Sequence, residues 1–193
     1  MKIICHYLPG GPSFTLPETA VGREGQPFFV PDDLGTIVAT PVVIVPIMRL
    51  GKHIARQFAH RYYTQWSAGV LFVCKERLDE LRSAGFPWAD AFAFDGALRV
   101  GKWKAMDEQA ATLPHHLCLQ FANSNPLEID VPALRDVVDA MIQRESKWNT
   151  LRQGDYLIFQ PEESGPEQCS LYSLYLCLRL CLLCRRRHLP CMR

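Results

Sequence analysis

The chain has 193 residues, of which 48% are hydrophobic and 21% are charged, and its formal net charge is +1. This composition is typical of a globular protein. The near-zero net charge gives no electrostatic reason to expect nucleic acid or a membrane surface as a partner. The first residues hold too short an apolar run for a secretory signal, and no run reaches membrane-spanning length. We therefore expect a cytoplasmic protein.

The amino-terminal part predicts strands rather than helices. Residues 1–30 are rich in Pro and Gly, which predicts short extended pieces separated by turns. The run IVATPVVIVPI (37–47) is rich in β-branched residues and predicts a strand. Pro41 and Pro46 cannot donate to a strand ladder, so they indicate an edge strand, a bulge or strand ends.

The rest of the chain alternates between helical and extended patterns. Apolar side chains at three- and four-residue spacing predict helices at 51–66, 75–85 and 131–146. Short apolar or alternating runs predict strands at 67–74, 116–122 and 152–159. Between them, 86–96 is expected to be a loop that ends in a turn at Asp95-Gly96. The residues alone therefore indicate a mostly β domain with a few helices.

The cysteines are unevenly placed. Cys5, Cys74 and Cys118 stand alone and are expected to be buried thiols, whereas the other five lie in the last 25 residues. Soft ligands in this tail have zinc-like spacing: Cys177, Cys181, Cys184, His188 and Cys191. However, the tail is biased towards Leu, Cys and Arg and lacks the turns of a zinc knuckle. We favour an out-of-frame or disordered end over a zinc site.

Three long segments give a family resemblance. They are RLGKHIARQFAHRYY (49–63), LRSAGFPWADAFAFDG (81–96) and LRQGDYLIF (151–159), with support from LPETAV (16–21), GQPFFVPDD (25–33) and ANSNPLEIDVPALRDVV (122–138). Their order and spacing resemble bacterial members of the fumarylacetoacetate hydrolase family. The resemblance implies an α+β, mostly β fold: a mixed β-sheet roll with a few short helices, usually paired in homodimers. It covers a single domain at 1–160, with 1–30 as a variant lid region, and leaves 161–193 as an atypical tail.

The resemblance also implies a metal site, which this chain lacks. Family members hold Mg²⁺ or Mn²⁺ with three carboxylates, hard ligands that suit a cation acting as a Lewis acid on dicarbonyl substrates. The corresponding positions here are Thr40, Val42 and Leu71, none of which is a carboxylate. The lysine of the family that orients the substrate corresponds to Phe92. The His/Glu pair of the family's lid has no equivalent in CHYLPGGPSF (5–14).

The expected function follows from these replacements. Asp95, Gly96 and Asn123 remain as remnants of a substrate pocket, while no catalytic or metal-binding residue is intact. We therefore expect an inactive or impaired member of the family, without a cofactor, that pairs with itself or with a paralogue. A small carboxylate is the expected ligand, if there is one. The alternative is an active metal-dependent hydrolase, decarboxylase or isomerase of dicarbonyl or acylpyruvate-type acids that uses other ligands.

Overall fold

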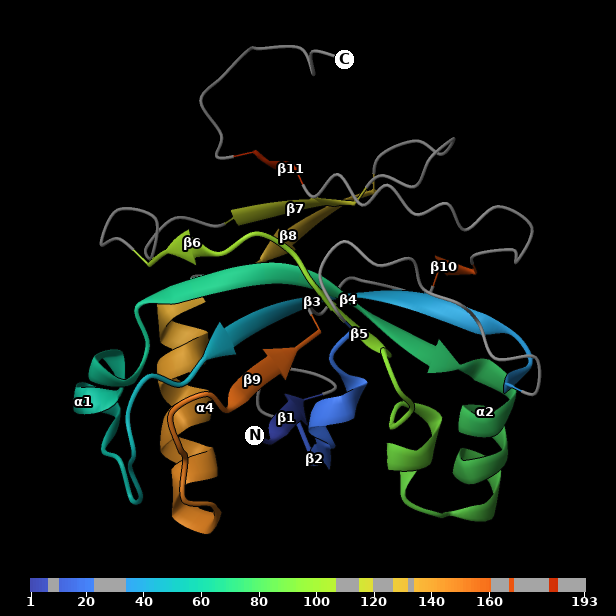
Figure 1. Ribbon diagram of the computed structural model, residues 1–193, viewed down its shortest axis with the longest axis horizontal. Helices are drawn as coiled ribbons and strands as arrows, with labels where there is room; N and C mark the ends of the chain where they lie inside the picture. Colours follow the sequence, from blue (N-terminus) through green and yellow to red (C-terminus); the bar gives the residue numbers. More distant parts are fainter. Residues whose placement is uncertain are drawn as a thin grey trace.

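The computed structural model describes residues 1–6, 11–22, 34–106, 115–119, 127–131, 134–160, 167–168 and 181–183. Two sheets and three α-helices make up this part of the chain (Figure 1). The predicted α+β, mostly β fold is confirmed.

An eight-stranded mixed sheet forms the body. Its main path runs β2 (Ser13–Leu16), β1 (Ile3–His6), β9 (Tyr156–Phe159), β3 (Ile37–Pro46), β4 (Gln65–Cys74) and β5 (Leu98–Val100). β10 (Glu167–Gln168) pairs with β3, and β6 (Lys104–Ala105) pairs with β4. Only the β1–β9 pairing is parallel among these described pairs. A smaller sheet has the order β11 (Cys181–Leu183), β7 (His115–Leu119) and β8 (Leu127–Val131).

The strand predicted at 37–47 is confirmed as β3, but its place in the sheet differs from the expectation of an edge. β3 pairs along Ile37–Ile44 with β4 and, on its other side, with β10 and β9. Pro41 lies between the β10 pairing at Val38 and Ala39 and the β9 pairing that starts at Val43. Its missing N–H therefore falls where that side of β3 has no ladder partner among the described strands. Pro46 ends the strand, as predicted.

The helices agree with the prediction except at 51–66. α2 (Lys75–Ala84) ends at Gly85, whose left-handed φ of 71° closes the helix, and α4 (Leu134–Trp148) covers most of the predicted third helix. At 51–66 only α1 (Arg56–Ala59) and the 3₁₀ turn η3 (His60–Tyr62) form. His53 has a φ of +52°, and the backbone N–H of Ile54 donates to Ser146 Oγ at 2.9 Å. The segment before α1 is therefore held as a loop against α4.

Two apolar cores lie on opposite faces of the sheet, because side chains alternate along a strand. α4 and odd-numbered residues of β3 such as Val43 and Val45 belong to one core. α2, the 3₁₀ turn η4 (Trp88–Ala91) and even-numbered residues such as Val42 and Ile44 belong to the other. In Figure 1, α4 and α2 accordingly lie at opposite sides of the sheet. We call these the α4 face and the α2 face.

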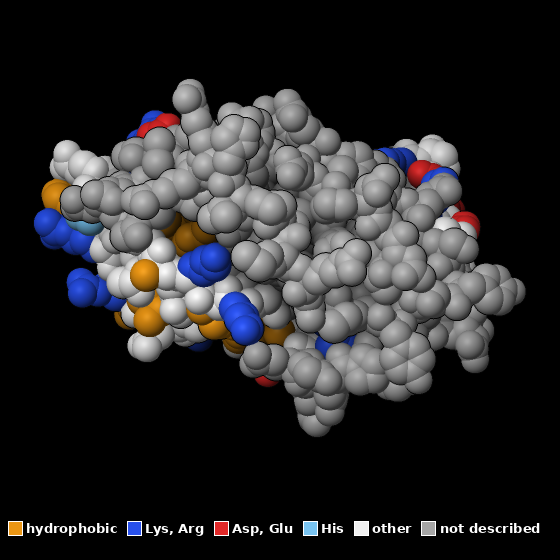
Figure 2. All heavy atoms as spheres, turned by 90° about the horizontal axis from the view of Figure 1, so that it is seen from above, with side chains coloured by type: hydrophobic (Ala, Val, Ile, Leu, Met, Phe, Trp, Pro, Cys, Tyr) orange, Lys and Arg blue, Asp and Glu red, His pale blue; other side chains and the backbone are white. Residues whose placement is uncertain are grey.

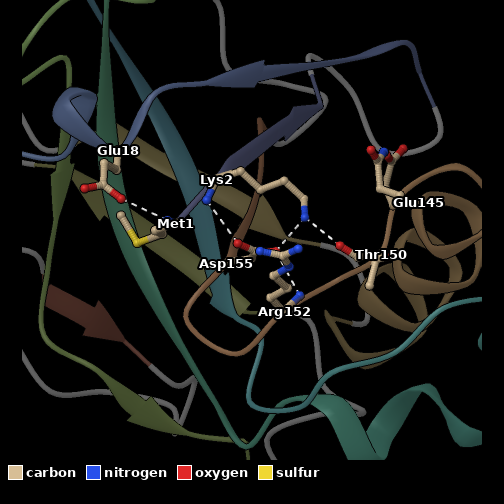
Figure 3. Close-up of polar contacts among 8 residues, drawn as sticks. Met1, Lys2, Glu18, Glu145, Thr150, Arg152 and Asp155 are labelled. Atoms are coloured by element: carbon tan, nitrogen blue, oxygen red, sulfur yellow. Dashed lines mark hydrogen bonds and ion pairs between the residues drawn. The ribbon is translucent and has the colours of Figure 1, made fainter.

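A buried carboxylate ties the amino terminus to the turn before β9. Asp155 is 3% exposed and accepts hydrogen bonds from Lys2 Nζ (2.7 Å), the Lys2 backbone N–H (3.0 Å) and the Arg152 backbone N–H (2.9 Å). Lys2 Nζ also donates to the carbonyl of Thr150 at 2.6 Å (Figure 3). Burial alone would raise the pKa of Asp155, but these hydrogen bonds and the Lys2 charge hold that pKa below its ordinary value.

Some of the remaining predictions concern described residues, and others fall on residues outside the described part of the chain. Cys5 and Cys74 are buried free thiols, as expected. The strands at 67–74, 116–122 and 152–159 correspond to β4, β7 and β9. Asn123, Cys177, Cys184, His188 and Cys191 lie outside the described residues, and the backbone at Cys181 belongs to β11.

No helix among the described residues is long and apolar enough to cross a membrane. On the face seen in Figure 2, the described basic side chains lie next to apolar side chains in some places and next to acidic ones in others.

Candidate functional site

The four positions at which the resemblance places a metal ligand or a catalytic lysine all border one cavity. Thr40 and Val42 lie on the same face of β3, and Leu71 of β4 is the cross-strand partner of Thr40. Phe92 follows η4 and forms a wall on the same face. The cavity holds about 120 Å³. Strand geometry therefore brings together residues that are far apart in the sequence.

The floor and walls of this cavity are mainly apolar. Strand residues form the floor, and a tilted pair of aromatic rings, Phe14 and Phe92, with centroids 4.9 Å apart, contributes to the wall. Buried residues of β1 and the residue that follows β9, Gln160, also border the cavity. The described lining consists of Cys5, His6, Phe14, Val38, Thr40, Val42, Leu71, Val73, Lys75, Leu78, Asp79, Arg82, Phe92 and Gln160.

Charged side chains border the cavity only along α2, within the lining just given. Lys75, Asp79 and Arg82 lie three or four residues apart, on one side of the helix. Asp79 and Arg82 are exposed, whereas Lys75 is half-buried. The cavity is therefore bordered by exposed and half-buried side chains along α2, one of them acidic and two basic.

The residues present do not fit a divalent metal ion. Hard cations require several oxygen ligands, mostly carboxylates, and the only carboxylate in the described lining is the exposed Asp79. No cluster of three His, Cys, Asp or Glu side chains occurs anywhere in the described residues. Burial raises the pKa of the Cys5 thiol, and a sulfur ligand does not suit a hard cation such as Mg²⁺. We therefore assign no metal-dependent step to this cavity.

A second polar group lies on the α4 face and was not predicted from the sequence. Glu145 is 2% exposed and accepts hydrogen bonds from Ser13 Oγ (3.0 Å) and Asn149 Nδ2 (3.2 Å). Its Oε1 also lies 3.3 Å from Nε2 of the fully buried His6. Burial lowers the pKa of His6, while the Glu145 charge opposes that change.

The sequence does contain a signal for Glu145. This residue continues the spacing of the buried side chains Val138, Met141 and Ile142 along α4, so a helical projection places a carboxylate on the buried face. Its partners could not be found in that way, because His6 and Ser13 lie more than 130 residues earlier. Both join through the β1–β2 pairing, in which His6 is opposite Ser13.

Of the predicted remnants of a substrate pocket, Asp95 and Gly96 are not in the described lining of the cavity, and Asn123 lies outside the described residues. Asp95 is exposed, and Gly96 forms the predicted turn, with a φ of +75° and its N–H donating to the carbonyl of Thr19 at 3.0 Å. The lining residues Cys5, Phe14 and Lys75 were not predicted as site residues, although Cys5 was predicted as a buried thiol. They are brought in by strand pairing and by the packing of α2.

Comparison with known proteins identifies the fold. The mixed sheet, with a helix against each face, resembles solved structures of hydrolases and isomerases. A protein of Yersinia pestis assigned to the fumarylacetoacetate hydrolase family shares 24% identity, with a TM-score of 0.73 over 86% of this chain and 83% of that one. The fumarylpyruvate hydrolase of Pseudomonas aeruginosa, solved with Mn²⁺ and pyruvate, shares 20% identity, with a TM-score of 0.71 over 87% and 81%.

An isomerase has the same architecture. The 5-carboxymethyl-2-hydroxymuconate delta-isomerase of Mycobacterium smegmatis shares 19% identity, with a TM-score of 0.70 over 86% of this chain and 70% of that one. No family model matches the sequence, and neither does any curated protein. The chain has the fold of the fumarylacetoacetate hydrolase family.

Proposed function

We propose that this chain is a metal-free, catalytically inactive protein with the fumarylacetoacetate hydrolase fold. The observation that carries the proposal is the cavity floor. Thr40, Val42 and Leu71 converge there, at the positions that the resemblance assigns to three carboxylates. A neutral hydroxyl and two aliphatic side chains cannot replace the charge that holds Mg²⁺ or Mn²⁺ in an oxygen-ligand site.

The role that we propose for the protein is binding or assembly. Without a metal, a protein of this fold can still bind a ligand in the cavity or assemble with a second chain. Pairing with itself or with an active paralogue in the cytoplasm remains the expected mode of action. Light scattering after size exclusion, alone and with such a paralogue, measures this directly, and a monomer in both samples would contradict it.

The effect of Mg²⁺ and Mn²⁺ on the melting temperature of the purified protein tests the proposed absence of a metal site. The protein is treated with EDTA, dialysed, and heated with Mg²⁺ or Mn²⁺ at about one hundred times a typical dissociation constant. A native site would then add about 2.7 kcal/mol to the free energy of unfolding. For a domain of this size that is roughly 5–11 °C in melting temperature. We expect no shift.

A matched variant shows whether a metal-induced shift in melting temperature arises in this cavity. Asp79→Asn removes the only carboxylate in the described lining of the cavity. A metal-induced shift in the wild type that disappears in Asp79→Asn would place a cation in this cavity and overturn the proposal. Turnover of an acylpyruvate by the metal-loaded protein would overturn it as well.

A further inference from the structure

The strand floor of the cavity, formed by β3 and β4, carries one polar side chain in its described lining, Thr40, while His6 of β1 lines another part of the cavity. Thr40 is 6% exposed and points to the α2 face together with its neighbours Val38 and Val42, which also line the cavity. Within the described part of the chain, its hydroxyl makes no hydrogen bond. The fully buried polar side-chain atoms without a partner in the described residues belong to His6 and Arg135, so the Thr40 oxygen is open to the cavity and can bond to an oxygen or nitrogen atom of a ligand.

The size and the walls of the cavity indicate what surrounds that hydrogen bond. A cavity of about 150 Å³ lined by Leu, Ile and Phe in another protein accepts benzene, and the volume here is about 120 Å³. The Phe14–Phe92 pair offers aromatic surface, and Val42 and Leu71 offer aliphatic surface. One six-membered ring, or an aliphatic group of similar size, matches this space.

The charge distribution favours a neutral ligand over an anion. The two basic side chains lie along α2 and share that side of the cavity with Asp79. The floor beside Thr40 is formed by Val38, Val42, Leu71 and Val73. A carboxylate placed next to Thr40 would lose its hydration against apolar side chains, with a single neutral hydroxyl in exchange.

We propose that this cavity binds a small neutral aromatic molecule with one hydrogen-bonding oxygen, of the size and polarity of phenol. The ring lies between the aliphatic floor and the aromatic wall, and the oxygen bonds to the Thr40 hydroxyl. Lys75, Asp79 and Arg82 remain at the solvent side and do not contact the ring oxygen. This inference rests on the proposed absence of a metal from the same cavity.

Ligand-observed NMR on the full chain in the presence of EDTA tests the inference, with phenol, toluene and benzoate as probes. For about seven heavy atoms, we expect phenol to bind with a dissociation constant of about 0.1–1 mM. Toluene should bind about fivefold more weakly, the contribution of one neutral hydrogen bond, and benzoate at least tenfold more weakly. Failure of phenol to bind below about 10 mM would overturn the inference.

Variants distinguish the hydrogen bond to Thr40 from the apolar contacts of the ring. Thr40→Val keeps the shape of the side chain and should weaken phenol about fivefold while leaving toluene unchanged. The exposed strand residue Thr15 offers a matched control, since Thr15→Val should change neither. Leu71→Phe and Val42→Leu each fill part of the cavity and should abolish binding of both probes. Circular dichroism and the melting curve identify a filled variant that has lost its fold.

Four further outcomes would each decide a part of the inference. Benzoate binding as tight as phenol, and lost in Lys75→Gln, would replace the neutral ligand by an acid. Phenol binding that Thr40→Val leaves unchanged would remove Thr40 from the site. If Mn²⁺ binds in this cavity, the proposed function fails. If neither Mn²⁺ nor phenol binds, only the present inference fails.

Discussion

The buried carboxylate of Asp155 offers a direct test of how the amino terminus is held. Asp155 accepts three hydrogen bonds, one of them from the Lys2 ammonium, while almost wholly removed from solvent. Removing one partner of a buried pair typically costs about 3–5 kcal/mol, and because the Lys2 side chain stays 27% exposed, the cost here should be about 3 kcal/mol, the lower end of that range. We therefore expect Asp155→Ala to lower the free energy of unfolding at neutral pH by about that amount.

The isosteric variant Asp155→Asn isolates the charge. It keeps the shape and one acceptor oxygen but weakens the bonds from Lys2 and Arg152, which should cost about 1.5–3 kcal/mol. Asp95 provides the control, because its carboxylate is exposed and Asp95→Asn should change stability by less than about 0.5 kcal/mol. Urea denaturation at several pH values measures the free energy of unfolding of the wild type and the three variants.

The pH dependence of stability gives a further test of the Asp155 carboxylate. The pKa of Asp155 is below its ordinary value in the folded protein. Its contribution to stability is therefore present above the unfolded-state pKa of about 3.9, and is lost as the pH falls through the folded-state pKa. The gap between wild type and Asp155→Asn should narrow in that range. A gap that stays constant, or that equals the Asp95→Asn effect at neutral pH, would refute this account of the amino terminus.

Two further predictions concern the two faces of the sheet. The triple variant Thr40→Glu/Val42→Glu/Leu71→Asp should be less stable than wild type by about 5 kcal/mol without metal, since buried unpaired carboxylates are costly. It should regain about 2.7 kcal/mol with Mn²⁺ at one hundred times its dissociation constant. A triple variant that folds but ignores Mn²⁺ in thermal melts would refute the assignment of these positions. On the α4 face, Glu145→Gln removes the charge that opposes the effect of burial on His6. The His6 pKa, followed by NMR titration of its imidazole, should then fall further below its ordinary value, and an unchanged or higher pKa would contradict the proximity of the two side chains.

Sequence reasoning succeeded where the signal is local. β3 and β4 were predicted because β-branched and apolar runs bury both faces of a strand, and α2 because Gly85 closes it. The helix expected at 51–66 shows the limit of that reasoning. Its apolar spacing is helical, but the contact of Ile54 with Ser146 holds the preceding segment as a loop. That contact joins residues 92 positions apart, and local spacing carries no information about it.

For the candidate site, too, some residues could be predicted from the sequence and others could not. The resemblance supplied Thr40, Val42, Leu71 and Phe92, and strand alternation explains why they share a cavity. The other lining residues depend on the order of strands in the sheet. Cys5 reaches the cavity because β1 joins β9 in parallel and β9 joins β3, an arrangement that no single segment specifies.

The separation of the two cores has a consequence for protein engineering. The cavity residues of β3 and β4 lie on the α2 face, whereas α4 packs on the other face, against side chains such as Val43 and Phe72. Changes at positions 40, 42 and 71 therefore leave the contacts of α4 in place. His6 is an exception to this separation, because it both lines the cavity and lies 3.3 Å from Glu145 of α4. A library varied at positions 40, 42 and 71 could therefore select new ligands while the packing on the α4 face preserves the folded scaffold.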